Sequence, residues 1–86
     1  MALLLALLKT EEIKIRVILV GVFRIDRFKE EVRHYREGVT VREVVASLRL
    51  PEQLLGIVVI NDVHAGTEDV LADGDVLALF PLLDGG

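Results

Sequence analysis

The sequence predicts a small α+β domain in which one helix packs on one face of a mixed β-sheet. Three observations lead to this fold class. Hydrophobic and charged residues alternate at 12–20, which is typical of a half-buried strand. A capped amphipathic helix is predicted at 41–49, and apolar runs at 57–60 and 76–80 have the length of buried strands. A chain of 86 residues suffices for one domain, which we place at residues 12–83.

The predicted strand at 12–20 carries its basic residues only in its first half. Further along the same face, Ile18 and Val20 stand at the positions where the alternation would place further polar residues. The strand is therefore expected to be central, or covered on both faces at its second end. A more polar strand follows at 28–35, and its charges suit a sheet edge because they discourage pairing with other chains.

The helix has the clearest signals in the sequence. Thr40 and Glu43 match the Thr-x-x-Glu capping box, in which each side chain satisfies a free backbone N–H at a helix start. The helix is predicted from Val41 to Arg49, with Pro51 ending it. Its hydrophobic face, at the spacing of one helical stripe, consists of Val41, Val44, Val45 and Leu48. Such a helix can serve as the crossover that parallel neighbouring strands require.

The second half of the sequence alternates apolar runs with turn residues. The stretch after 57–60 begins with turn chemistry at 61–62 and is expected to hold one short strand. A tight turn is predicted at 73–75, and the last strand follows it and ends at Phe80. Pro81 then closes the strand, because proline cannot donate a hydrogen bond to the ladder.

Composition excludes several classes of function. A net charge of −4 without a basic block argues against nucleic-acid binding, which needs clustered lysine and arginine. Charged residues make up 28% of the chain, and the apolar segment Ala2–Leu8 is far shorter than the ~20 residues that span a bilayer. We therefore expect a cytoplasmic protein without membrane contact, in which residues 1–11 form an apolar extension.

The usual catalytic and metal-binding patterns are also missing from the sequence. There is no cysteine, and His34 and His64 lack the spacing of a metal site. Asp73 and Asp75 lack the rest of a calcium loop, and Ser47 has no matched base. No glycine-rich phosphate loop is present. We expect no bound metal or cofactor, and a protein that is not itself an enzyme.

The sequence ends in Gly85-Gly86. A glycine pair adds no apolar burial and loses much conformational freedom on ordering, so it contributes little to a fold. It suits a narrow tail that enters a channel with its carboxylate exposed. We therefore expect residues 84–86 to form a flexible tail, with the α-carboxylate of Gly86 as the reactive group.

The ordered motifs of the second half resemble the MoaD/ThiS family of ubiquitin-like β-grasp sulfur carriers. The family pattern is an apolar strand ending in Asn, then Leu-x-Asp-Gly-Asp, a further apolar strand, Phe-Pro and a terminal Gly-Gly. The resemblance covers about residues 12–86, and Arg24 looks like an arginine of molybdopterin-synthase small subunits. The matching segments are Ile57–Asn61, Leu71–Val76, Leu79–Pro81 and Gly85-Gly86.

The resemblance implies how such a tail would react. An E1-like enzyme would use ATP and magnesium to adenylate the carboxylate of Gly86, and a sulfur donor would convert it to a thiocarboxylate. Gly85 and Asp84 would belong to the inserted tail. The sulfur would then serve a cofactor-synthesising enzyme, with the molybdopterin synthase large subunit expected first and thiazole synthase next. The residues expected to contact partners are Phe80, Pro81, Leu82, Leu83 and Arg24.

Other interpretations of the same sequence stay open at this point. A ubiquitin-like modifier would use the same activation but would be joined through Gly86 to lysines of target proteins. A non-catalytic β-grasp binding module would keep only the fold. For individual residues, Phe80 could equally be a core residue, and Arg24 a solvated surface charge.

Overall fold

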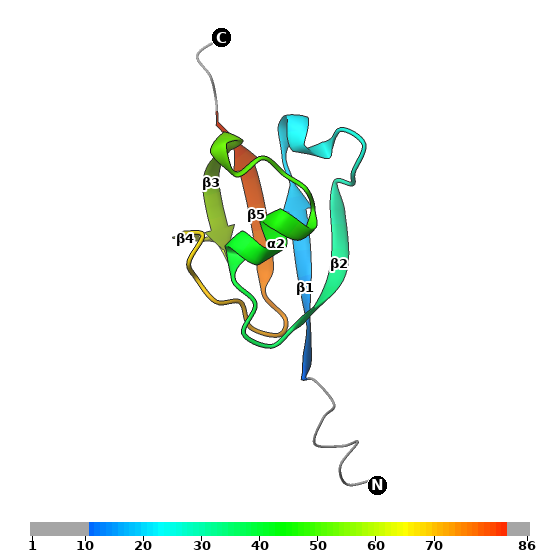
Figure 1. Cartoon of the computed structure of the whole chain (residues 1–86), viewed down its shortest axis with the longest axis vertical. Coiled ribbons are helices and arrows are strands. Elements are labelled where there is room, and N and C mark those ends of the chain that lie inside the picture. Colours follow the sequence, from blue (N-terminus) through cyan, green and yellow to red (C-terminus); the bar gives the residue numbers. More distant parts are fainter. Residues whose placement is uncertain (1–10, 83–86) are drawn as a thin grey trace, which may run out of the picture.

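A computed structural model describes residues 11–82 and shows a single sheet with one α-helix across it (Figure 1). Two short 3-10 helices, η1 and η2, connect the main elements. In chain order the elements are β1 (Glu12–Leu19), η1 (Gly21–Arg24), β2 (Glu30–Arg36), α2 (Val41–Ser47), η2 (Glu52–Leu54), β3 (Leu55–Ile60), β4 (Val63–Ala65) and β5 (Val76–Pro81).

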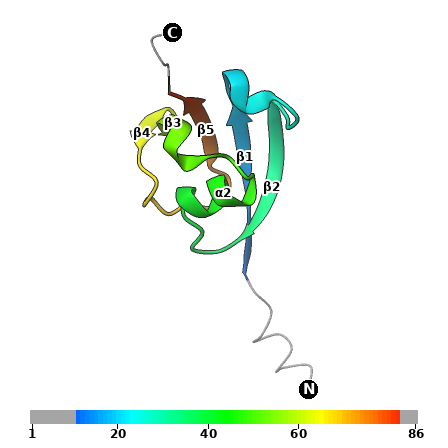
Figure 2. The same ribbon diagram turned by 45° about the horizontal axis from the view of Figure 1, so that its top comes forward.

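The sheet has the order β2-β1-β5-β3-β4. The central pair β1 and β5 is parallel, with Ile18 opposite Ala78, while the other neighbours pair antiparallel. Helix α2 lies across one face of this mixed sheet in both views (Figures 1 and 2). The arrangement confirms the predicted ubiquitin-like β-grasp fold, the central position of β1 and the edge position of β2.

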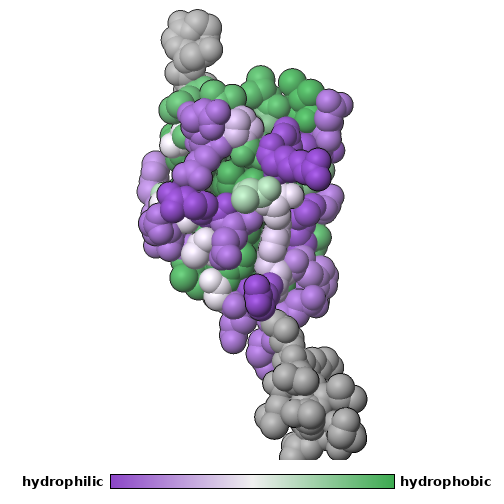
Figure 3. Space-filling model, viewed as in Figure 1, coloured by the Kyte–Doolittle hydropathy of each residue, from purple (hydrophilic) through white to green (hydrophobic). Residues whose placement is uncertain are grey.

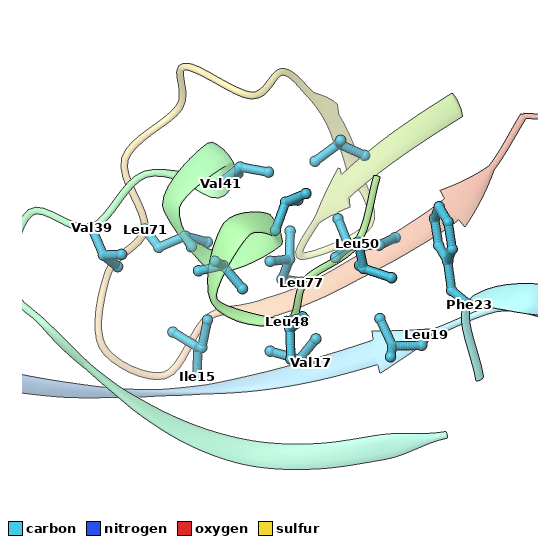
Figure 4. Close-up of a cluster of buried hydrophobic side chains, with 14 of the residues drawn as sticks. Ile15, Val17, Leu19, Phe23, Val39, Val41, Leu48, Leu50, Leu71 and Leu77 are labelled. Atoms are coloured by element: carbon cyan, nitrogen blue, oxygen red, sulfur yellow. The ribbon is translucent and has the colours of Figure 1, made fainter. Parts of the chain in front are cut away.

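The core lies between α2 and the sheet face that the helix covers (Figure 4). Alternate residues of β1 and β5 enter it, and the period of two in the first strand correctly marks the buried face. The helix contributes the face predicted from its apolar spacing. Side chains from these elements with at most 1% of their surface exposed are Ile15, Val17, Leu19, Val41, Val44, Val45, Leu77 and Leu79.

The start of α2 follows the prediction, whereas its end comes earlier. The amide of Glu43 donates to Thr40 Oγ1 at 3.2 Å, and the Thr40 amide donates to Glu43 Oε1 at 2.9 Å. The helix ends at Ser47 rather than Arg49, because Arg49 adopts a left-handed conformation with φ of 57°. The amide of Leu50 then donates to the Val45 carbonyl, which closes a Schellman motif.

Several strand boundaries also differ from the prediction, and β5 extends one residue beyond the expected end at Phe80, because Pro81 still pairs with Leu55. Strand β1 ends at Leu19 and β2 begins only at Glu30, because η1 and a loop take up the residues between them. No pattern in the sequence predicted η1, which starts at Gly21 with φ of 60° and buries Phe23. Strand β3 starts at Leu55, two residues earlier than expected. Leu55 still pairs with Pro81, on the far side of a bulge that interrupts the register before Ile57.

Arg27 connects the loop after η1 to the end of α2. Its Nε donates to the Leu48 carbonyl at 3.1 Å, and its Nη2 donates to the Arg49 carbonyl at 3.0 Å. Its Nη1 reaches the carbonyls of Phe23 and Ile25. One guanidinium thereby satisfies carbonyl groups from two segments, including those that the end of a helix leaves without partners.

The predicted turns hold the start of β5 in place. Asn61 Nδ2 donates to Asp75 Oδ1 at 2.8 Å, and Asn61 Oδ1 accepts the Val76 amide at 2.9 Å. Asp73 Oδ1 accepts the amide of Lys14 at 2.7 Å, and Asp75 also accepts the amide of Ala72. The two aspartates of this turn therefore act as acceptors for neighbouring strands and turns.

Val44→Asp should unfold the domain. The Val44 side chain is 0% exposed, and an unpaired carboxylate at that position costs several kcal/mol, a large share of the about 5–15 kcal/mol that stabilises a typical domain. Circular dichroism and the dispersion of amide NMR signals would report the loss. Ala46→Asp, at an exposed position of the same helix, is the matched control and should stay folded. A folded Val44→Asp protein would show that the helix does not pack as described.

Arg27→Met should lower the free energy of unfolding by about 1–2 kcal/mol, because carbonyl groups of η1 and α2 lose a charged donor while the aliphatic stem is kept. Urea unfolding measures this directly. Arg36→Met, at an exposed position of β2, is the control and should change stability little. Equal stabilities for the two variants would mean that the hydrogen bonds of Arg27 to the end of α2 do not stabilise the loop after η1.

Candidate functional site at the root of the C-terminal tail

The predicted reactive tail begins where the described part of the structure ends. Leu83, Asp84, Gly85 and Gly86 lie outside the described residues, so the roles expected for them stay predictions. Leu82 is the last described residue and has 54% of its surface exposed. The site can therefore be built up to the root of the tail, which is formed by the end of β5 and the elements beside it.

Phe80 lies on the sheet face opposite α2. Its neighbours Leu77 and Leu79 enter the core, and the period of two of a strand places Phe80 on the other face. It pairs with Ile57 of β3, which is 44% exposed. Phe80 is half-buried and is not among the buried core residues, so its position favours the partner-contact interpretation over the core one.

Phe80 belongs to a continuous apolar area, here called the open-face patch. The strand registers bring its residues from β1, β5 and β3 next to one another on the uncovered face. All are hydrophobic and only partly buried. An apolar area of this kind on a small domain commonly marks an interaction site. The open-face patch consists of Ile18, Ile57, Val59, Val76, Ala78 and Phe80.

A second group of exposed apolar side chains surrounds the point where the chain leaves β5. Val22 of η1 is 59% exposed and Leu54 of η2 is 48% exposed, and the amide of Leu82 donates to the Leu54 carbonyl. We call these three residues the tail rim. Hydrophobic surface gathers at this end of the molecule (Figure 3). Sequence reasoning missed Val22 and Leu54, because a single apolar residue in a loop gives no periodic signal.

Arg24 lies at the end of η1, at the same end of the sheet as the tail rim. Its Nε donates to the carbonyl of Leu19, the last residue of β1, at 2.8 Å. The side chain is therefore partly fixed against the sheet, although the residue remains exposed. This position is compatible with the expected partner contact and places a positive charge beside the apolar rim.

The other polar groups considered from the sequence have structural roles. A hollow of about 450 Å³ lies between β2 and α2, near the loop at Gly38 and so at the end of the domain opposite the tail. There Ser47 Oγ lies 2.8 Å from the hydroxyl of Tyr35 and donates to the Val44 carbonyl. These contacts place Ser47 in a structural network that joins α2 to β2.

Charged groups outside this hollow likewise join structural elements. Hydrogen bonds to Glu52 and Glu68 raise the pKa of Arg42 above its ordinary value and join α2 to η2 and the loop after β4. Over residues 11–82, no three His, Asp or Glu side chains gather into a possible metal site. In that same range no helix has the length and hydrophobicity needed to cross a membrane.

Several solved structures share this fold. A putative molybdopterin converting factor subunit 1 from Pyrococcus furiosus is 22% identical and aligns over 83% of this chain and 99% of its own, with a TM-score of 0.67. Small archaeal modifier protein 1 from Haloferax volcanii is 21% identical, with coverages of 83% and 99% and a TM-score of 0.68.

A complex of subunits 1 and 2 of the molybdopterin-converting factor from Helicobacter pylori also matches, with 23% identity, coverages of 86% and 100%, and a TM-score of 0.53. No curated protein sequence matches the chain. The family comparison extends from β1 through the tail root to the glycine pair. Since the ThiS family matches residues 17–86, most of the sequence, the chain belongs to the ThiS family.

Proposed function

We propose that this protein is a sulfur carrier that bears a thiocarboxylate on Gly86 and donates its sulfur in cofactor biosynthesis, with molybdopterin the first candidate and the thiazole of thiamine the second. One observation carries the proposal. In a chain of the ThiS family, exposed hydrophobic surface surrounds the root of a segment that ends in Gly85-Gly86. A carrier needs this arrangement if an enzyme is to bind the domain while the carboxylate of the tail reacts in its active site.

The proposed chemistry has two steps. A carboxylate is a poor acyl donor because its oxygen leaves badly. In the first step, a carboxylate oxygen of Gly86 attacks the α-phosphorus of ATP, pyrophosphate departs and an acyl-adenylate forms. In the second, hydrosulfide attacks the acyl carbon, AMP leaves with the bonding electrons, and loss of the sulfur-bound proton gives the thiocarboxylate. We assign ATP and magnesium binding to an E1-like adenylating enzyme, so that the carrier is a substrate and not itself the catalyst.

The length of the tail limits how this enzyme can approach. Gly86 lies four positions beyond Leu82, and a fully extended segment of that length spans at most about 14 Å. An active site that reaches Gly86 must therefore come close to the tail rim. Apolar anchors with a polar border are typical of specific interfaces. In this proposal the tail rim and open-face patch supply the anchors, and Arg24 supplies a polar contact.

The likeness to the H. pylori complex supports a second partner of the same kind. In that complex a protein of this fold is assembled with subunit 2 of the molybdopterin-converting factor. We propose a corresponding cofactor-synthesising partner here, which would take the loaded tail after activation. The two partners would use the same end of the carrier at different times.

A second candidate function is protein modification. The likeness to small archaeal modifier protein 1 favours it, because that protein has the same fold at a similar level of identity. A modifier would share the adenylation step but would end as an isopeptide between Gly86 and a lysine of a target protein. A binding module without tail chemistry is the third possibility. The three are separated by what becomes attached to Gly86.

Incubation with ATP, magnesium, an E1-like enzyme from the same organism and hydrosulfide should replace one C-terminal oxygen by sulfur. The intact mass of the protein measures this, and removal of Gly86 should abolish the change without a large shift in melting temperature, because glycine has no side chain to bury. An isopeptide on a lysine instead of sulfur would establish a modifier. If the mass does not change with an enzyme that is active on another carrier, the binding module without tail chemistry is the remaining function.

Ile57→Asp should weaken docking of the activating enzyme. A charge in the open-face patch would be desolvated at the interface, and loss of a central contact typically reduces affinity by about 10–100-fold. The expected result is a raised KM with kcat nearly unchanged. Val70→Asp is the matched control, since Val70 is 62% exposed but lies beside Thr40, outside the patch. Equal KM values for both variants would show that the enzyme does not use this face.

A further inference from the structure

The root of the tail passes between two glycines. A Cβ on Gly21 would lie 3.4 Å from Pro81 Cγ. A Cβ on Gly56 would lie 2.9 Å from the Pro81 carbonyl oxygen and 3.0 Å from both Cα and N of Leu82. The second set of contacts is with backbone atoms, which cannot swing away as the end of a side chain can. The chain leaves β5 through a gap that has no space for a methyl group on the side of Gly56.

Gly56 is also the extra residue of the bulge in β3. Leu55 pairs with Pro81 and Ile57 pairs with Phe80, so the register skips Gly56. Bulges bend a strand and re-aim the groups beside it. Pro81 has no N–H to donate, and the next amide, that of Leu82, donates to the Leu54 carbonyl at 2.7 Å. That hydrogen bond is the last one that the described residues make along the path of the tail.

We propose that Gly56 and the Leu54 carbonyl form a tail clamp, a positioning device that fixes the direction in which the tail leaves the domain. The inference rests on the proposed function, in which an enzyme must receive the carboxylate of Gly86. With only four residues after Leu82, a change in direction at the root moves Gly86 away from an enzyme docked on the tail rim. A fixed root lowers the entropy lost when the tail enters the active site.

Alanine substitution at two glycines can test this clamp. Gly56 does not have a positive φ, so its backbone conformation is open to alanine and only the missing space requires glycine. Gly66 likewise has no positive φ, and a Cβ there would meet only Asp69 Oδ2 at 3.9 Å. Gly56→Ala and Gly66→Ala therefore make the same chemical change, once against the tail root and once in open space.

The test combines one measurement on the fold with one on the reaction. Hydrogen exchange should show that the Leu82 amide is protected in the unaltered protein and in Gly66→Ala, and exchanges faster in Gly56→Ala. The kcat/KM for sulfur loading of Gly86 should fall about tenfold or more in Gly56→Ala, since small misplacements of reacting groups have effects of this size. Gly66→Ala should load at the rate of the unaltered protein and melt at the same temperature, and Gly56→Ala should still be folded at the assay temperature.

Each outcome decides between the alternatives. An unchanged loading rate in Gly56→Ala, or a Leu82 amide unprotected in the unaltered protein, would overturn the clamp. If the unaltered protein accepts no sulfur, the proposed function fails, and the exchange of the Leu82 amide still decides whether Gly56 holds the tail root.

If Gly56→Ala does not fold, a semisynthetic protein with an ester bond in place of the Leu82 amide removes the donor and keeps every side chain. Slower loading in that protein supports the clamp, and an unaltered rate rejects it.

Discussion

The parallel pairing of β1 with β5 is the constraint on which the rest of the molecule depends. Because the two strands run the same way, the segment after β1 and the tail after β5 leave the sheet at one end. Strand β3 runs antiparallel to β5, so its start lies at that end too. Val22, Arg24, Leu54 and Gly56 gather around the tail root for this reason, although 34 positions separate Val22 from Gly56 in the sequence.

The pairing in turn depends on the turn predicted at 73–75. Asp73 and Asp75 accept amides from Lys14 and Ala72, and Asn61 bonds to both Asp75 and Val76. These contacts fix where β5 begins relative to β1 and β3. A slip of one residue in β5 would move Leu77 and Leu79 out of the core and reverse the face on which Phe80 lies. The turn at 73–75 and Asn61 therefore determine where the tail root lies, because they fix the register of β5.

The sequence predicted what local patterns determine. The alternation in β1, the capping box at Thr40 and the turn before β5 identified the main elements, and the family motifs identified the fold. The missed features depend on groups distant in the sequence. The bulge at Gly56 is needed because Pro81 passes beside it, and η1 is held by Arg27 through the end of α2. Likewise, nothing near Leu54 in the sequence shows that it borders the tail.

The hydrogen-bonded part of β5 extends almost to the last described residue. Strand β5 lies between two partner strands, so its hydrogen bonds on both sides resist a pull on the tail. Pro81 interrupts the ladder, and only the Leu82 amide continues it. That hydrogen bond can break without disturbing Leu77 and Leu79, whose side chains are buried in the core. Under the proposed function, the domain would dock as a rigid body and present a fixed tail root to the enzyme that receives Gly86.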